Sequence, residues 1–158
     1  MDFTESYIKN KQVCVIKADN AAKYTDLASM AGAKIVAEAG SAGEKAVQAD
    51  ETLKKANYTA VSVQSNALME VKAGTADVAV IDYVMAKSMV GEGTDYSDLV
   101  IVDGVELAVE EYAIGLRVGS TETLKKFNEV IEKLIASGKL DEIAEKYGLT
   151  DSLLSNQK

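Results

Sequence analysis

Asp82 is the side chain of this sequence best placed to bind a ligand. It directly follows residues 78–81, a run of apolar residues typical of a strand buried on both faces of a parallel sheet. In open α/β sheets, ligands bind in the crevice outside the carboxyl ends of the strands. A carboxylate at such a point must be solvated or paired. We therefore expect Asp82 to contact a ligand, and its structural alternative is to cap the helix that follows.

A short glycine-containing loop is the second candidate. It consists of Gly40, Ser41, Ala42 and Gly43 and leads into a predicted helix over residues 44–56. The N–H groups at a helix start lack partners and carry the positive end of the helix dipole, so they attract a carboxylate or phosphate. Ser41 also has a plain structural role, because serine is a good N-cap for its own helix. The two roles are compatible.

Strands and helices alternate along the chain, which is typical of an α/β fold with a mostly parallel sheet flanked by helices. If the sheet is parallel, the carboxyl ends of its strands share one edge. We therefore expect the loop 40–43 and Asp82 to lie together. The predicted strands are residues 12–17, 34–38, 58–63, 78–81, 99–102 and 111–117. The predicted helices are residues 26–30, 44–56, 66–73 (capped by Ser65 and ended by Gly74), 84–90 and 120–136.

Composition excludes several classes of function. The chain has 158 residues and a formal net charge of −8, which disfavours nucleic acid and anionic membranes as partners. No apolar run approaches the length of a membrane span. There is no histidine and a single cysteine, Cys14, inside an apolar strand. We therefore expect no enzyme activity, no metal and no cofactor, and we interpret Cys14 as a buried small hydrophobe.

Three motifs in order carry a resemblance to a known family. They are DFTESY at residues 2–7, the helix–AGTAD–strand–Asp pattern that ends at Asp82, and the C-terminal run EYAIGLRVG followed by a long helix and GKLDEIAEKYG. Together they resemble the periplasmic solute-binding proteins of polar amino-acid ABC transporters (type II, family 3). The resemblance covers essentially the whole chain. It implies one lobe of a type II periplasmic-binding-protein fold with a C-terminal strand–helix–helix segment.

The resemblance also implies roles for the candidate residues. Asp82 would hold the α-ammonium group of a free amino acid, and the loop 40–43 would hold its α-carboxylate. Ala42 departs from the family pattern, which often has threonine there. Glu38 departs as well, because family members often have glutamine or a basic residue at that position. Glu38 would add a negative charge near the subsite for the ligand's carboxylate. This charge would favour a ligand with a cationic side chain, or it would mark a site that no longer binds.

By the same resemblance, most of the first lobe has no counterpart in this chain. We expect residues 1–9 to be a remnant of the crossing between lobes, residues 10–110 to form lobe two, and residues 111–158 to be the C-terminal part of lobe one. We expect weak binding or none in a monomer. The implied partners are a free amino acid and a transporter permease. The implied location is periplasmic or extracellular, although without a recognisable signal peptide we expect the chain as expressed to be cytoplasmic.

Two alternatives from other classes remain open. An aspartate at the end of a buried strand also resembles the phosphoacceptor of response-regulator receivers, although a receiver needs an acidic pair after its first strand and only Asp19 is present. The other alternative is an oligomeric interaction module that binds no ligand. Binding of an amino acid would distinguish the solute-binding protein from both.

The C-terminal helices predict self-association. Apolar residues recur on one face of the predicted helix 120–136 and of the short helix after it. In the resembled family these faces pack on the first-lobe sheet. Leaving four such side chains in water would forgo roughly 6–12 kcal/mol. We therefore predict a homodimer through residues 111–147, with exchange of that segment as one form of it. The predicted interface residues are Leu124, Phe127, Ile131, Leu134, Ile143 and Tyr147.

Overall fold

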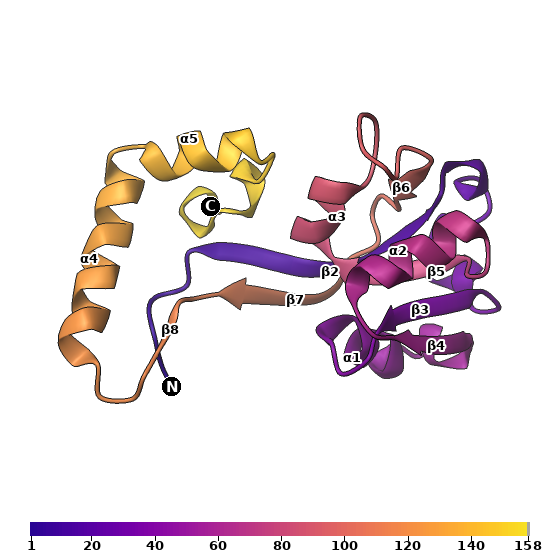
Figure 1. Cartoon of the computed structure of the whole chain (residues 1–158), viewed down its shortest axis with the longest axis horizontal. Helices are drawn as coiled ribbons and strands as arrows, with labels where there is room; N and C mark the ends of the chain where they lie inside the picture. The colour runs from indigo at the N-terminus through magenta and orange to yellow at the C-terminus, as the bar shows by residue number, and fades with distance from the viewer. Residues whose placement is uncertain (158) are drawn as a thin grey trace. The chain divides into compact units, whose positions relative to one another are not determined.

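The computed structural model of the protein describes residues 1–157 and divides into two compact units (Figure 1). Unit 2 is the continuous segment Lys11–Val109, and unit 1 combines Met1–Asn10 with Glu110–Lys158. Two strands run through both units: β2 (Ile8–Lys17) and β7 (Leu107–Tyr112).

The sheet of unit 2 has the strand order β4-β3-β5-β2-β6, and β7 pairs with β2 outside this path. β3 (Lys34–Glu38) runs parallel to both β4 (Asn57–Val61) and β5 (Val78–Asp82). β2 is antiparallel to β5 and to β6 (Leu99–Ile101). β3, β4, β5 and β6 therefore share one direction, as the predicted mostly parallel sheet requires, and β2 is the reversed strand among them.

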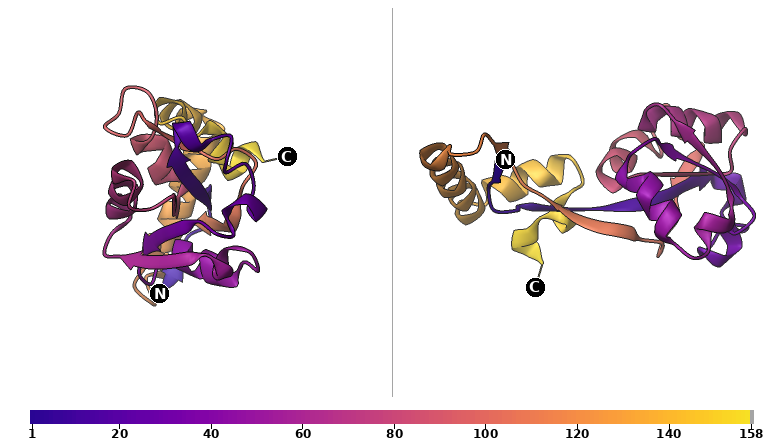
Figure 2. Two further views of the ribbon diagram at one scale, coloured as in Figure 1. Left: turned by 90° about the vertical axis from the view of Figure 1, so that its right-hand side faces the viewer. Right: turned by 90° about the horizontal axis from the view of Figure 1, so that it is seen from below.

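Helices cover both faces of this sheet and bury its apolar strands (Figure 2). Cys14, Ile35 and Val80 face the cluster that contains Ala46 and Val47 of α1 (Ala42–Ala49). Their neighbours along the strands face the opposite cluster, formed with α2 (Gln64–Ala73) and α3 (Tyr83–Met89). The alternation is the two-residue period of a β-strand, and burial on both faces explains the continuous apolar runs of β2 and β5.

Several element boundaries differ from those expected. α2 begins at Gln64 and Val63 is its N-cap residue, so Ser65 lies inside the helix and the prediction that it caps the helix was wrong. The predicted end at Gly74 is correct, because Gly74 has a left-handed φ of 79°. The helix expected over residues 44–56 ends at Ala49, where the Asp50 carboxylate accepts bonds from the Thr52 and Leu53 N–H groups. Such local bonds compete with helix continuation.

β2 is longer than expected, because it begins at Ile8 and not at residue 12, and most other elements are shorter or shifted by a few residues. The predicted helix 26–30 is a single 3₁₀ turn, Ala28–Met30, and further 3₁₀ turns lie at Ala18–Asn20 and Leu53–Lys55. The predicted strand 111–117 is divided between the end of β7 and β8 (Gly115–Leu116).

Unit 1 is built around a small antiparallel pair and two helices. β1 (Asp2–Phe3) pairs with β8, and α4 (Thr121–Ala136) and α5 (Lys139–Lys146) follow. Ile8 forms a bridge with Leu153, between the 3₁₀ turns Thr150–Ser152 and Leu154–Asn156. Among the described residues of this unit, Ala144 and Leu153 are the buried hydrophobic side chains, whereas unit 2 contains the two large core clusters.

Candidate ligand site at the sheet edge

Asp82 ends β5 and precedes α3, so it lies at the carboxyl edge of the parallel strands. Its carboxylate accepts hydrogen bonds from two amide side chains. Gln12 Nε2 lies 2.6 Å from Oδ1, and Gln64 Nε2 lies 2.6 Å from Oδ2. Asp82 is also the N-cap residue of α3, the position that the structural alternative required. The two amide donors hold the carboxylate in a fixed orientation while the residue stays partly exposed.

Gln12 reaches this edge because β2 runs against the other strands. In the antiparallel pair of β2 with β5, Gln12 lies directly opposite Asp82. Gln12 is 1% exposed, so the pairing of its amide compensates for the loss of water. Gln12 was not among the residues predicted for the site, although a glutamine that shares a strand face with Cys14 and Ile16 was a usable signal.

Gln64 is the first residue of α2 and follows β4 closely, so it also lies at the carboxyl edge. It makes two bonds with one residue, because its Nε2 donates to the Asp82 carboxylate and its Oε1 accepts from the Asp82 N–H at 3.0 Å. This reciprocal pair links the start of α2 to the end of β5. Nothing in the sequence separated Gln64 from an ordinary helix-surface glutamine.

The loop 40–43 turns the chain from β3 into α1. Gly40 has a left-handed φ of 74°, which favours glycine. Ser41 Oγ accepts from the Glu44 N–H at 3.1 Å and so caps α1, the structural role that the sequence allowed. In return, Glu44 Oε2 accepts from the Gly40 N–H at 2.6 Å. The N–H groups of Ala42 and Gly43, at the first two helical positions, have no acceptor within the helix itself.

Glu44 is held in turn by Tyr58 on β4. The Tyr58 hydroxyl donates to Glu44 Oε1 at 3.0 Å, so one carboxylate joins the loop to the edge strand. Burial and the hydrogen bond to Glu44 raise the pKa of Tyr58 to about 12. The phenol is therefore a neutral donor that fixes Glu44, and Glu44 fixes the loop.

Gly43 brings the start of α1 against β5 and Gln12. A Cβ atom at this position would lie 2.7 Å from the Val80 carbonyl oxygen and 3.2 Å from Gln12 Oε1. Only glycine permits this approach. Gln12 therefore contacts the start of α1 and also donates to Asp82, which places the loop and the carboxylate at the same edge of the sheet, as expected.

Glu38 ends β3 at this same edge but belongs to the other face. Val36 packs in the cluster on the α2 side, and the two-residue strand period puts Glu38 on that side too. Val80 belongs to the α1 side, and the same period puts Asp82 there. The two carboxylates are therefore separated by the strand ends and do not form a shared acidic pair.

The arrangement can bind a zwitterion, with negative charge at Asp82 and helix N–H groups at the start of α1. It offers no nucleophile–base pair. Burial, and secondarily the charge of Asp50, raise the pKa of Cys14 to about 12, so its thiol stays protonated and unreactive at neutral pH. Within residues 1–157, no group of three or more Cys, Asp or Glu side chains is arranged to hold a metal ion.

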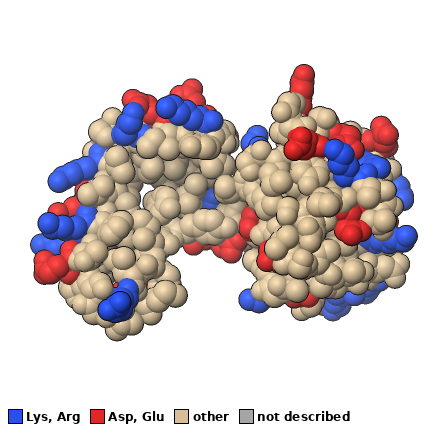
Figure 3. Space-filling model, in the orientation of Figure 1, with Lys and Arg blue, Asp and Glu red and all other residues tan. Residues whose placement is uncertain are grey.

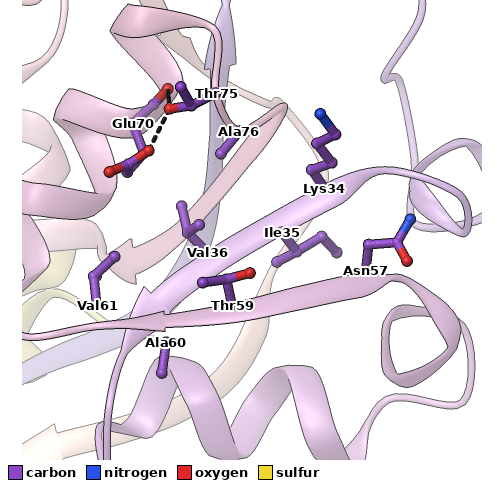
Figure 4. A pocket seen from close by; sticks show the side chains of 10 residues that line it. All are labelled: Lys34, Ile35, Val36, Asn57, Thr59, Ala60, Val61, Glu70, Thr75 and Ala76. Carbon is purple, nitrogen blue, oxygen red and sulfur yellow. Dashed lines mark hydrogen bonds between the residues drawn. The ribbon is translucent and has the colours of Figure 1, made fainter.

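A pocket of about 410 Å³ lies elsewhere on unit 2, along β3 and β4 and beside the end of α2 (Figure 4). Its polar groups include Lys34 and the Glu70–Thr75 pair, in which the threonine hydroxyl donates to the carboxylate. None of the predicted site residues lines it. The pocket is therefore separate from the candidate site.

Comparison with known proteins gives consistent results. The family described as "Bacterial extracellular solute-binding proteins, family 3" matches residues 1–150. The L-arginine-binding protein of Pseudomonas aeruginosa is 29% identical over 161 residues, a match that spans 99% of this chain and 61% of the relative.

Solved structures agree with this match. An amino acid ABC transporter substrate-binding protein of Streptococcus pneumoniae, bound to L-arginine, has a TM-score of 0.77 and 29% identity over 92% of this chain and 60% of that one. The ancestral amino acid-binding protein AncCDT-1, described as a precursor of cyclohexadienyl dehydratase, has a TM-score of 0.76 and 27% identity, over 92% and 61% of the two chains. This chain thus spans less than two thirds of the length of these relatives.

Proposed function

Because this chain belongs to the bacterial extracellular solute-binding proteins of family 3, we propose that it is a substrate-binding component, or a part of one, of an ABC transporter for a cationic amino acid. The observation that carries the proposal is the joint placement of Asp82 and the start of α1 at one sheet edge, connected through Gln12. Membership of this family is incompatible with the alternative of a response-regulator receiver. The family comprises solute-binding proteins rather than enzymes.

The α-amino and α-carboxylate groups of the ligand would each meet an opposite charge. Asp82 would accept from the α-ammonium group, since two neutral amides orient its carboxylate without neutralising it. The N–H groups of Ala42 and Gly43 would donate to the α-carboxylate. The Ser41 hydroxyl would add a third donor, because its oxygen accepts from Glu44 while its own proton can point to the ligand. Such charge-assisted bonds are the strong class.

Glu38 would select a cationic side chain. It lies at the same edge on the opposite face from Asp82, so it would not compete with Asp82 for the α-ammonium group. Two of the relatives described above are named for L-arginine or carry it, which makes arginine the first ligand to test. A carboxylate facing a guanidinium gives the bidentate geometry that arginine favours.

We expect a weaker affinity than that of the longer relatives, because this chain provides less than two thirds of their length and a ligand on unit 2 would be less completely removed from water. The proposed partner is the transporter permease, and the proposed place of action is outside the cytoplasmic membrane. No helix within residues 1–157 combines the length and apolar character needed to cross a bilayer.

Thermal unfolding with a panel of amino acids tests the proposal. Arginine at about 100 times its Kd should stabilise the protein by about 2.7 kcal/mol. Citrulline is the matched control, because it has the shape of arginine without the positive charge, and it should stabilise the protein much less. Glu38→Gln should reduce the difference between the two ligands. A protein that no amino acid stabilises would instead be the oligomeric module without a ligand.

A further inference from the structure

The pocket along β3 and β4 is a second place on unit 2 where a small molecule can bind. Its volume of about 410 Å³ falls in the range typical of ligand pockets, roughly 300–1,000 Å³. Val36, Val61 and Ala76 line it and belong to the core cluster on the α2 side of the sheet. Thr59 lies beside Val36 in the parallel register and is exposed. The pocket therefore has a mainly apolar floor with one hydroxyl on it (Figure 4).

Two opposite charges line this pocket without pairing with each other. Glu70 projects from α2, and the Thr75 hydroxyl donates to one of its carboxylate oxygens, Oε2. The same hydroxyl lies 3.0 Å from the Glu70 carbonyl oxygen, so the loop after α2 holds the glutamate in place. Within residues 1–157, Glu70 Oε1 has no hydrogen-bond or ion-pair partner, and neither has the ammonium group of Lys34. Both groups are available to a ligand.

The two charges lie on different sides of the apolar floor. Lys34 and Val36 are two residues apart on β3, so they share a face and are separated by roughly 7 Å along the strand. Figure 4 shows Val36 between Lys34 and the Glu70–Thr75 pair. A ligand that meets both charges must therefore carry an ammonium group and a carboxylate at opposite ends of an apolar body.

The surrounding surface suits a ligand without net charge. Figure 3 shows both acidic and basic side chains on the visible face of unit 2, with uncharged surface between them. A zwitterion meets no field of a single sign there. A simple anion or cation would satisfy only one of the two charged groups of the pocket.

We propose that this pocket binds a small ω-amino acid, in which a short apolar chain separates the ammonium group from the carboxylate. The ammonium group donates to Glu70 Oε1, the carboxylate accepts from the Lys34 ammonium group, and the chain lies on Val36 and Val61. An α-amino acid fits less well, because both of its charges are attached to one carbon atom. The pocket is separate from Asp82, so it can bind its ligand whether or not arginine binds at Asp82.

Titration of the full chain with δ-aminovalerate, followed by NMR of the backbone amides, tests the proposal. The Kd should be of the order of 1 mM, because the pocket is open to solvent. Norvaline is an isomer with both charges on one carbon atom, whereas n-pentylamine and valerate each lack one charge. All three should bind about fivefold more weakly or worse. The amide signals that shift should be those of the lining residues Lys34, Thr59, Ala60, Glu70 and Thr75.

Three outcomes of this titration would overturn the proposal. The first is the absence of saturable shifts. The second is a set of shifts confined to Asp82 and the loop 40–43, which would place the ligand at the other site. The third is equal affinity for norvaline and δ-aminovalerate.

Substitutions test the two ends of the pocket separately. Glu70→Gln keeps an acceptor for the Thr75 hydroxyl, and Lys34→Met keeps the apolar stem and the backbone N–H that donates to Asp77 Oδ2 at 2.9 Å. Both variants should therefore fold normally, which circular dichroism checks. Each should bind δ-aminovalerate about fivefold more weakly. Wild-type affinity in either folded variant would contradict the assigned contacts.

Lys45→Met is the matched control, because it makes the same change as Lys34→Met on α1, on the opposite face of the sheet. It should bind δ-aminovalerate like the wild type. Asp82→Asn should also leave this affinity unchanged, and Glu70→Gln should leave the affinity for arginine unchanged. Failure of one site therefore leaves the other to be judged on its own data.

Discussion

Gln12 and Asp82 face each other across an antiparallel strand pair, and the Gln12 amide donates to the Asp82 carboxylate at 2.6 Å. This bond crosses between two strands that are far apart in sequence. It connects a buried amide to the carboxylate that we propose as the ligand contact. The orientation of Asp82 therefore depends on the core of unit 2 and not on a surface loop.

Replacement of Gln12 by leucine should weaken both the fold and the site. The change removes a buried donor and leaves Asp82 with one of its two amide partners, so we expect a loss of about 1–3 kcal/mol in the free energy of unfolding. Urea denaturation measures it. Arginine binding should weaken as well, because the carboxylate is less well oriented. Unchanged stability and unchanged affinity would show that the bond has no role in either.

Asp82→Asn should reduce ligand affinity by roughly 1.5–3 kcal/mol, because it removes a charge-assisted contact to an α-ammonium group. Titration calorimetry at matched ionic strength measures the difference. The asparagine amide also meets two amide donors, Gln12 and Gln64, so the unfolding free energy must be measured alongside. A folded variant with wild-type affinity would restrict Asp82 to a structural role.

Ser41 allows capping to be separated from ligand binding. Ser41→Ala removes the acceptor of the Glu44 N–H and should cost about 0.5–2 kcal/mol of stability. Ser41→Asp keeps a good N-cap acceptor, so stability should remain near that of the wild type, but its negative charge should repel a ligand carboxylate. If Ser41→Asp binds arginine as well as the wild type does, the start of α1 does not hold that carboxylate.

Gly43→Ala should be strongly unfavourable because its Cβ would meet the Val80 carbonyl oxygen at 2.7 Å, and backbone must shift to relieve the clash. We expect a loss of about 1–3 kcal/mol. Gly32→Ala is the matched control, since its Cβ would have no neighbour within 4 Å. Thermal unfolding of both variants measures the contrast. Equal tolerance of the two substitutions would disprove the close packing of α1 on β5.

The stability of the protein should fall as the pH rises through the range from about 10 to about 12. The pKa of Tyr58 is raised from 10.0 to about 12, so the folded state keeps its proton where the unfolded chain has lost it. The unfolded state then binds fewer protons, and the stabilising contribution, complete below pH 10, is lost with increasing pH. Tyr58→Phe removes this group while other titrations continue. Its unfolding free energy should therefore decline less steeply over this range than that of the wild type.

The parallel core of the fold was predictable, and the reversed strand was not. The apolar run of β5 and the glycine at the end of α2 have purely local signals, so their positions were found from sequence. The direction of β2 depends on pairing between segments nearly seventy residues apart, which no local pattern encodes. Gln12 and Gln64 were missed for the same reason, because only the tertiary fold brings their amides to Asp82.

The predicted helix boundaries were wrong where side-chain hydrogen bonds set the end or the start of a helix. Asp50 ends α1 early by binding the next N–H groups, although the apolar pattern continues to Ala56. Ser65 has the composition of a cap, but the bonds of Gln64 to Asp82 fix the helix start one residue before it. A local side-chain contact decided the first boundary, and a tertiary contact decided the second.

The division of the chain into a continuous unit 2 and a discontinuous unit 1 has a consequence for synthesis. All strands and helices that build the core of unit 2 emerge from the ribosome together, so this unit can fold while translation continues. The first ten residues cannot, because their backbone partners are Tyr112, Ile114 and Leu154, more than a hundred residues later. Residues 1–10 are thus made long before the residues that hold them, and they are among the last of this segment to reach their final position.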